Sequence, residues 1–177
     1  MKHLLSAALL LSTFAAHAAL TPEQVVAQAK AQFSDCEMED RTAESRVSTV
    51  TIKEEYVTNT YHVVLCSMAA YNDSSVVFYE GYAAEGQTPQ LMQIHLTEPV
   101  LGPRYGIKGY KSTSNAMGAG VDEKGILTTF AKGRGIGDSH YAGTYKLEGG
   151  EATLIKYSAD ITMDMRMNPK TIINIKQ

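Results

Sequence analysis

Hydrophobic and β-branched residues recur in short runs along the chain, and polar or glycine-containing segments separate these runs. From residue 47 onward the runs cover residues 47–57, 61–68, 76–82, 91–96, 126–132, 141–147, 152–159, 163–167 and 171–175. Short runs rich in Val, Ile, Thr and Tyr are typical of β-strands. Asn59-Thr60 and the sequence EGGE at 148–151 supply turn residues for two hairpins. The pattern predicts a mainly β (α+β) fold with an antiparallel barrel-like or sandwich-like sheet.

One segment near the N-terminus has the periodicity of a helix. Its apolar residues recur at the spacing of one helix face: Val25, Val26, Ala29 and Phe33. Thr21 can cap the first turn, Pro22 suits the first helical position, and Gln24 can return the capping hydrogen bond. We therefore expect one N-terminal amphipathic helix over residues 22–34, packed against the sheet.

Residues 104–122, RYGIKGYKSTSNAMGAGVD, show no clear periodicity. The stretch is polar and glycine-rich, and we interpret it as a long connection between strands. A connection of this length inside a compact domain is often either mobile or functional, and the sequence leaves both interpretations open.

The first 18 residues, MKHLLSAALLLSTFAAHA, combine a basic start, a short apolar run and a small-x-small cleavage site. These features predict a secretory signal peptide over 1–18 and a periplasmic or secreted protein. The remaining residues, 19–177, are the length of a single β-rich domain. No other apolar run is long enough for a membrane span.

The net charge of −3 and the absence of a clustered basic patch argue against a nucleic-acid partner.

The chain has two cysteines, Cys36 and Cys66. In an oxidising compartment we expect these two residues to form a disulfide. The alternative is a pair of buried free thiols.

The sequence KGRGIGDSH at 132–140 contains three glycines at alternate positions: Gly133, Gly135 and Gly137. A phosphate-binding loop would require these glycines to open a helix, but strand-like sequence follows them. Alternate glycines beside a strand favour a tight bend or bulge instead. Arg134 and Asp138 are placed to hold such a bend together.

These residues resemble a known family, domain-of-unknown-function family 1176. Its members are exported bacterial proteins with the pattern Lys-Gly-Arg-Gly-Leu-Gly-Asp-Cys-Gly, which is similar to residues 132–139 here. An upstream family pattern, a Cys followed by Gly-Ala-Tyr-Asn and a Ser, is similar to the segment that contains Cys66, Tyr71 and Asn72. The resemblance covers about residues 61–157. It implies export and a β-rich fold, with these glycines, Tyr71 and Asn72 as structural motif residues, and it implies no reaction.

The sequence departs from the family pattern in informative places. Ser139 stands where the family has a cysteine, and the corresponding downstream stretch, 161–167, has no cysteine either. Both halves of a disulfide implied by the family are therefore missing together. Ala69 stands where the upstream motif has glycine.

Candidate chemistry is sparse. Asp138, Ser139 and His140 are residue types of a catalytic triad, but adjacent residues project in different directions, whereas a triad converges from separate elements. A hydrolase with a site at the glycine bend is one alternative. No spacing typical of a zinc site occurs, and nothing in the sequence indicates a cofactor.

A second alternative comes from Met163, Met165 and Met167 in the sequence MDMRM. Alternation along a strand would place three thioethers on one face, where they could bind Cu(I). The competing interpretation is that these methionines fill the core, because Met is an adaptable core residue.

The leading hypothesis is a non-enzymatic protein that binds a protein or a component of the cell envelope. Ten tyrosines and no tryptophan favour a recognition face, although tyrosine is also common on half-buried strands. We expect the binding surface to combine the glycine bend with residues 103–120. Its candidate residues are Arg134, Asp138, His140, Tyr141, Tyr105 and Tyr110.

Overall fold

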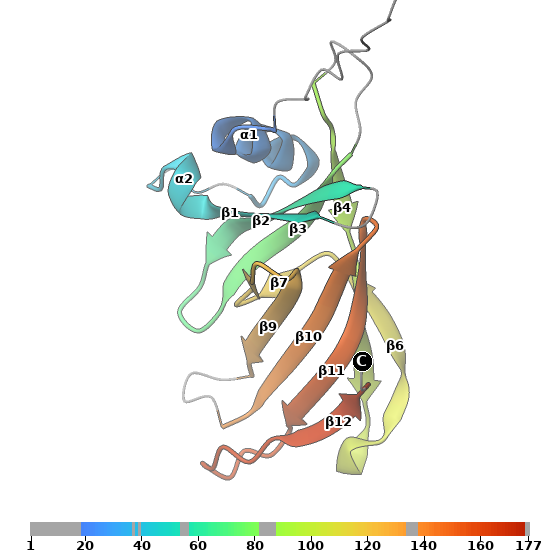
Figure 1. Cartoon of the computed structure of the whole chain (residues 1–177). Helices are drawn as coiled ribbons and strands as arrows, with labels where there is room; N and C mark the ends of the chain where they lie inside the picture. The colour runs from blue at the N-terminus through green and yellow to red at the C-terminus, as the bar shows by residue number, and fades with distance from the viewer. Residues whose placement is uncertain are drawn as a thin grey trace, which may run out of the picture.

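The computed structural model of this chain describes residues 19–36, 38, 40–53, 57–81, 88–133 and 138–175. The signal peptide expected over 1–18 lies outside the described residues, as do Arg134, Gly135 and Gly137. The described part is mainly β, and its strand pairs are antiparallel (Figure 1). No helix in this part is long and apolar enough to cross a membrane.

The first sheet contains β1 (Val47–Lys53), β2 (Thr58–Met68), β3 (Asp73–Glu80) and β4 (Leu91–Ile94), in that order. The short strand β7 (Ala116–Met117) pairs with β3 near the start of that strand. Successive residues of β2 and β3 point to opposite faces, so this sheet is apolar on both sides.

The second sheet has the order β12 (Lys170–Asn174), β11 (Glu151–Asp160), β10 (His140–Glu148), β9 (Ile126–Lys132) and β8 (Gly120–Val121). The hairpin between β10 and β11 turns at Gly149 and Gly150, which both have positive φ. Side chains from the two sheets form one buried core, with Tyr61 and Val77 from the first sheet and Tyr145 and Leu147 from the second. Neither strand order returns on itself, so the described sheets do not close into a barrel.

A third, two-stranded sheet consists of β5 (Leu96–Leu101) and β6 (Ile107–Thr113), joined through a 3-10 turn at Pro103–Tyr105. The interpretation of 104–122 as a connection was therefore wrong, because this stretch contains β6, β7 and β8. In Figure 1 this ribbon lies beside the second sheet, and β5 is its strand in contact with β11.

Two helices, α1 (Pro22–Gln32) and α2 (Ala43–Arg46), precede the first strand. Thr21 and Gln24 form a reciprocal capping box at the start of α1. Val25 and Ala29 of α1 belong to a second apolar cluster, which includes Val64 and Phe78 on the outer face of the first sheet. The expected disulfide is confirmed, since Cys36 and Cys66 are bonded within this cluster.

The strand expected at 163–167 is absent. These residues connect β11 to β12 with a bend at 164–165, and the last strand begins at Lys170. The three methionines are exposed, at 67 % for Met163, 79 % for Met165 and 66 % for Met167, so the interpretation that they fill the core was also wrong.

His62 on β2 is a fully buried polar residue with partners on both ring nitrogens. Its Nδ1 lies 2.9 Å from Oγ1 of Thr49, and its Nε2 lies 3.0 Å from Oε2 of Glu80. Burial lowers the pKa of His62, against the opposing influence of Glu80.

The lowered pKa of His62 has a consequence for stability. Below pH ~6.5 the unfolded chain binds a proton at His62 that the folded chain does not, so the free energy of unfolding should fall as pH falls. One proton gives a slope of at most about 1.4 kcal/mol per pH unit. Urea denaturation from pH 7.5 to 5.5 should show this slope, and His62→Gln should reduce it. An unchanged slope in that variant would assign the titration to another group.

Candidate binding cleft

The two described ends of the glycine segment, Gly133 and Ser139, lie next to each other. The N–H of Gly133 donates to the carbonyl of Ser139 at 2.7 Å. A Cβ at Gly133 would lie 2.8 Å from Oγ of Ser139, so the close approach of these two segments favours glycine.

The two sequence motifs meet in space. The side chain of Asn72, in the turn between β2 and β3, accepts from the N–H of Lys132 at 2.7 Å and donates to its carbonyl at 3.0 Å. Asn72 therefore pairs with the last residue of β9 as a neighbouring strand would, immediately before the glycine bend. Tyr71 is 59 % exposed in the same turn.

The three triad-type residues are buried. Asp138 accepts from the N–H of Met165 at 3.0 Å, and the ring of His140 lies against Phe130 with centroids 5.1 Å apart. None of Asp138, Ser139 and His140 lines either hollow described below. Each of the three residues is at most 4 % exposed.

The larger hollow is a cleft of about 700 Å³ between the β5–β6 ribbon and the second sheet. Tyr141 on β10 lies on the same strand face as Tyr145 and Leu147, because residues two apart share a face. Tyr145 and Leu147 contribute to the core, whereas Tyr141 lines the cleft. The cleft is therefore an open continuation of the core face of the second sheet.

Apolar side chains form much of the cleft wall. Those from the ribbon and its turn are Pro99, Val100, Leu101 and Pro103, and those from the second sheet and its C-terminal connection are Ala131, Tyr141, Tyr157 and Ile161. Tyr157 is almost fully buried, and burial together with the charge of Glu98 raises the pKa of its hydroxyl. This hydroxyl stays protonated at neutral pH and can donate a hydrogen bond.

The charged groups of the cleft are Glu98, Lys108 and Lys111. Glu98 and Lys111 are opposite each other on β5 and β6 and form an ion pair at 3.1 Å. Lys108 packs its aliphatic stem over Gly102, and no acidic side chain among the described residues pairs with its ammonium group. The cleft therefore carries one cation in excess.

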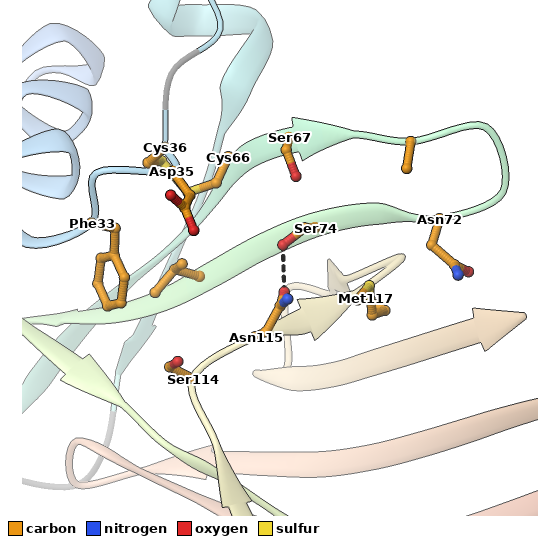
Figure 2. Close-up of a pocket in the computed structure, with 12 residues that line it drawn as sticks. Phe33, Asp35, Cys36, Cys66, Ser67, Asn72, Ser74, Ser114, Asn115 and Met117 are labelled. Carbon is orange, nitrogen blue, oxygen red and sulfur yellow. Dashed lines mark hydrogen bonds between the residues drawn. A yellow bond between two sulfur atoms is a disulfide. The ribbon is translucent and has the colours of Figure 1, made fainter. Parts of the chain in front are cut away.

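A smaller hollow of about 370 Å³ lies beside the disulfide (Figure 2). Its lining is mostly uncharged, with Phe33 at one end and the hydrogen-bonded pair Ser74 and Asn115 in the middle. Among the described residues that line it, Asp35 is the one ionisable side chain. Asn115 and Met117 line both hollows, so the short segment before and through β7 separates the two.

The structure places the expected binding residues in different surroundings. Tyr141 lines the cleft, whereas Tyr110 is exposed on β6 and is not part of the lining. The Tyr105 ring contacts the Lys170 ammonium, which lies 4.6 Å from its centroid, and its hydroxyl accepts from Ile161 N–H at 3.5 Å. Arg134 is outside the described residues. Among residues not expected at a site, Glu98 and Tyr157 line the cleft, and Lys108, which also lines it, lies within the expected range 103–120.

Among the residues that the structure describes, no group of three or more His, Cys, Asp or Glu side chains is arranged to hold a metal ion. A metal site in this part of the chain would have to use other ligands.

These features define a β-rich, disulfide-containing protein with an open amphipathic cleft. The chain belongs to the family described as protein of unknown function (DUF1176), whose model matches residues 10–166. Searches of curated proteins and of solved structures found no significant match.

Proposed function

We propose that this chain is an exported, non-enzymatic binding protein and that residues 19–177 act as one domain. Its ligand is an acidic, amphipathic component of the cell envelope: a molecule with an aliphatic chain and an anionic head group. The cleft between the β5–β6 ribbon and the second sheet is the proposed binding site.

The observation that carries this proposal is the Lys108 ammonium beside an apolar wall, with no acidic side chain paired to it in the described part of the chain. Val100, Leu101 and Ile161 offer a surface that favours an aliphatic chain over water. Lys108 supplies a charge for an anionic head group, and an ammonium without a local carboxylate can pair with a ligand without first breaking an ion pair.

The absence of converging reactive groups in the cleft supports binding over catalysis. Its ionisable side chains are two lysines, one glutamate and two tyrosines. The glutamate is already paired with Lys111, and the Tyr157 pKa is raised rather than lowered, which is opposite to what an activated nucleophile requires.

The proposal is tested by calorimetric titration of the purified protein with dodecanoate, below the concentration at which dodecanoate forms micelles. Lys108→Gln should weaken binding roughly tenfold, which corresponds to about 1.4 kcal/mol. Dodecyl maltoside, which has the same aliphatic chain and a neutral head group, should bind more weakly than dodecanoate to the unmodified protein.

Lys124→Gln is the matched control. Lys124 is also exposed, but it lies in the turn between β8 and β9, beside the end of the second sheet that contains Leu147. This variant should bind dodecanoate as the unmodified protein does. If the two lysine variants lose affinity equally, or if dodecanoate does not bind, the cleft is not a site for acidic amphiphiles.

A further inference from the structure

The connection between β11 and β12 presents three thioethers to solvent. Met163, Met165 and Met167 are more exposed than the other exposed methionines of the described chain, Met68 at 50 % and Met92 at 51 %. Three large apolar side chains exposed within five successive residues are unfavourable in water. Such a group often marks a binding site.

Buried carboxylates hold this connection in place. Asp138 accepts from the N–H of Met165 at 3.0 Å, and Asp160 accepts from the N–H of Asn168 at 2.7 Å. Both aspartates are almost fully buried. Asp160 also accepts from the hydroxyl and the N–H of Thr162, and these hydrogen bonds lower the pKa of Asp160, so it stays ionised at neutral pH. The methionines are therefore displayed on an anchored backbone.

The backbone between the methionines is bent. Met165 has φ +63, a conformation that favours glycine, and the bend covers 164–165. In an extended strand, the Cα atoms of residues four apart are ~13 Å apart, so their thioethers could share one ion only with both side chains stretched toward each other. The bend shortens the separation of Met163 and Met167, and the Asp138 hydrogen bond fixes the residue at its centre.

We propose that the thioethers of Met163, Met165 and Met167 bind one soft monovalent metal ion, Cu(I) or its analogue Ag(I). Thioether sulfur is a soft, neutral ligand that favours Cu(I) over harder cations. The described residues offer no nearby cluster of His, Cys, Asp and Glu, so Zn(II) has no competing site of its preferred ligands in this part of the chain. Because thioethers do not titrate, binding should change little between pH 5 and pH 8.

The test is an anaerobic titration of the purified protein with Cu(I), kept reduced by ascorbate, in competition with bicinchoninate. One Cu(I) per chain should bind, and replacing the three methionines of the connection by leucine should weaken binding at least a hundredfold. Leucine keeps the apolar surface and removes the sulfur, so the comparison separates metal binding from an apolar contact. A double variant, Met68→Leu with Met92→Leu, is the matched control and should bind as the unmodified protein does.

A second readout locates the ion. With methyl-labelled methionine, Ag(I) should shift the methyl resonances of Met163, Met165 and Met167 and leave those of Met68 and Met92 in place. The proposal is overturned if the triple leucine variant binds Cu(I) as tightly as the unmodified protein, if the unmodified protein binds none, or if the control methyl groups shift equally. An unchanged urea denaturation midpoint provides the check that the triple variant is folded, and its outcome is independent of both the metal site and the cleft.

Discussion

Replacing Cys36 and Cys66 together by serine should lower the free energy of unfolding by roughly 3 to 4 kcal/mol. The bond closes a loop with a sequence separation of 30 residues, and in the chain-entropy model a loop of this length restricts the unfolded state by about that amount. The disulfide also lies in the cluster that joins α1 to the first sheet, so its loss should loosen the packing of Val25 and Phe33 on that sheet.

Urea denaturation of the double serine variant beside the unmodified protein measures this loss. Adding a thiol reductant to the unmodified protein should reproduce most of the change, and adding it to the variant should do nothing. A loss below about 1 kcal/mol would mean that the unfolded chain is already restrained at this point or that the bond is strained.

Gly118→Ala should strongly lower the free energy of unfolding, and Gly149→Ala is its matched control. Gly118 has φ +52, and a Cβ there would lie 2.6 Å from the carbonyl oxygen of Phe130. Neither backbone can move freely, since Gly118 donates to the carbonyl of Asp73 at 2.8 Å and Phe130 lies within β9. We expect a loss of about 3 kcal/mol, because the positive φ and the overlap each cost about 1 to 3 kcal/mol.

Gly149→Ala isolates the contribution of the backbone angle. Gly149 has a similar φ of +57 in the β10–β11 turn, but no atom lies within 4 Å of its hypothetical Cβ. Its variant should lose only about 1 kcal/mol. Equal losses for the two variants in thermal or urea denaturation would show that the contact between Gly118 and Phe130 adds nothing.

The sequence predicted elements that have strong turns or alternating burial. The run at 126–132 became β9 with the same bounds, and the EGGE turn joined β10 to β11. Burial alternates along β10 from Gly143 to Leu147 and along β9 from Leu127 to Thr129, so part of the pattern can be seen in the sequence.

Elements exposed on both faces were not predictable in this way. Five of the seven β6 residues are exposed, and the other two, Gly109 and Thr113, are half-buried, so the strand leaves no apolar period. The run at 91–96 reads as one strand, but it splits at exposed His95 between β4 in the first sheet and β5 in the ribbon. This change of sheet depends on tertiary packing and not on local preference.

In the methionine segment the sequence predicted a strand that the structure does not contain. Alternation at 163–167 predicted a strand, but the side chains of Asp138 and Asp160 bind backbone N–H groups that a strand would use for pairing. Asp138 is 27 residues from Met165 in sequence, so this competition could not be seen from the local pattern.

The cleft itself could be anticipated only in part. Tyr141 and residues 103–120 were expected to share a surface, and Tyr141, Pro103 and Lys108 do line one cleft. Tyr157 and Glu98 were missed, because each has an ordinary place in a strand pattern and comes to the cleft only through the packing of the ribbon on the second sheet.

The most direct test of the central claim is a two-dimensional NMR titration of isotope-labelled protein with dodecanoate. We expect progressive shifts at Val100, Lys108, Tyr141 and Tyr157, with Phe33 and Ser67 beside the disulfide unchanged. Shifts confined to the smaller hollow, or spread evenly over the surface, would contradict the assignment of the cleft as the binding site.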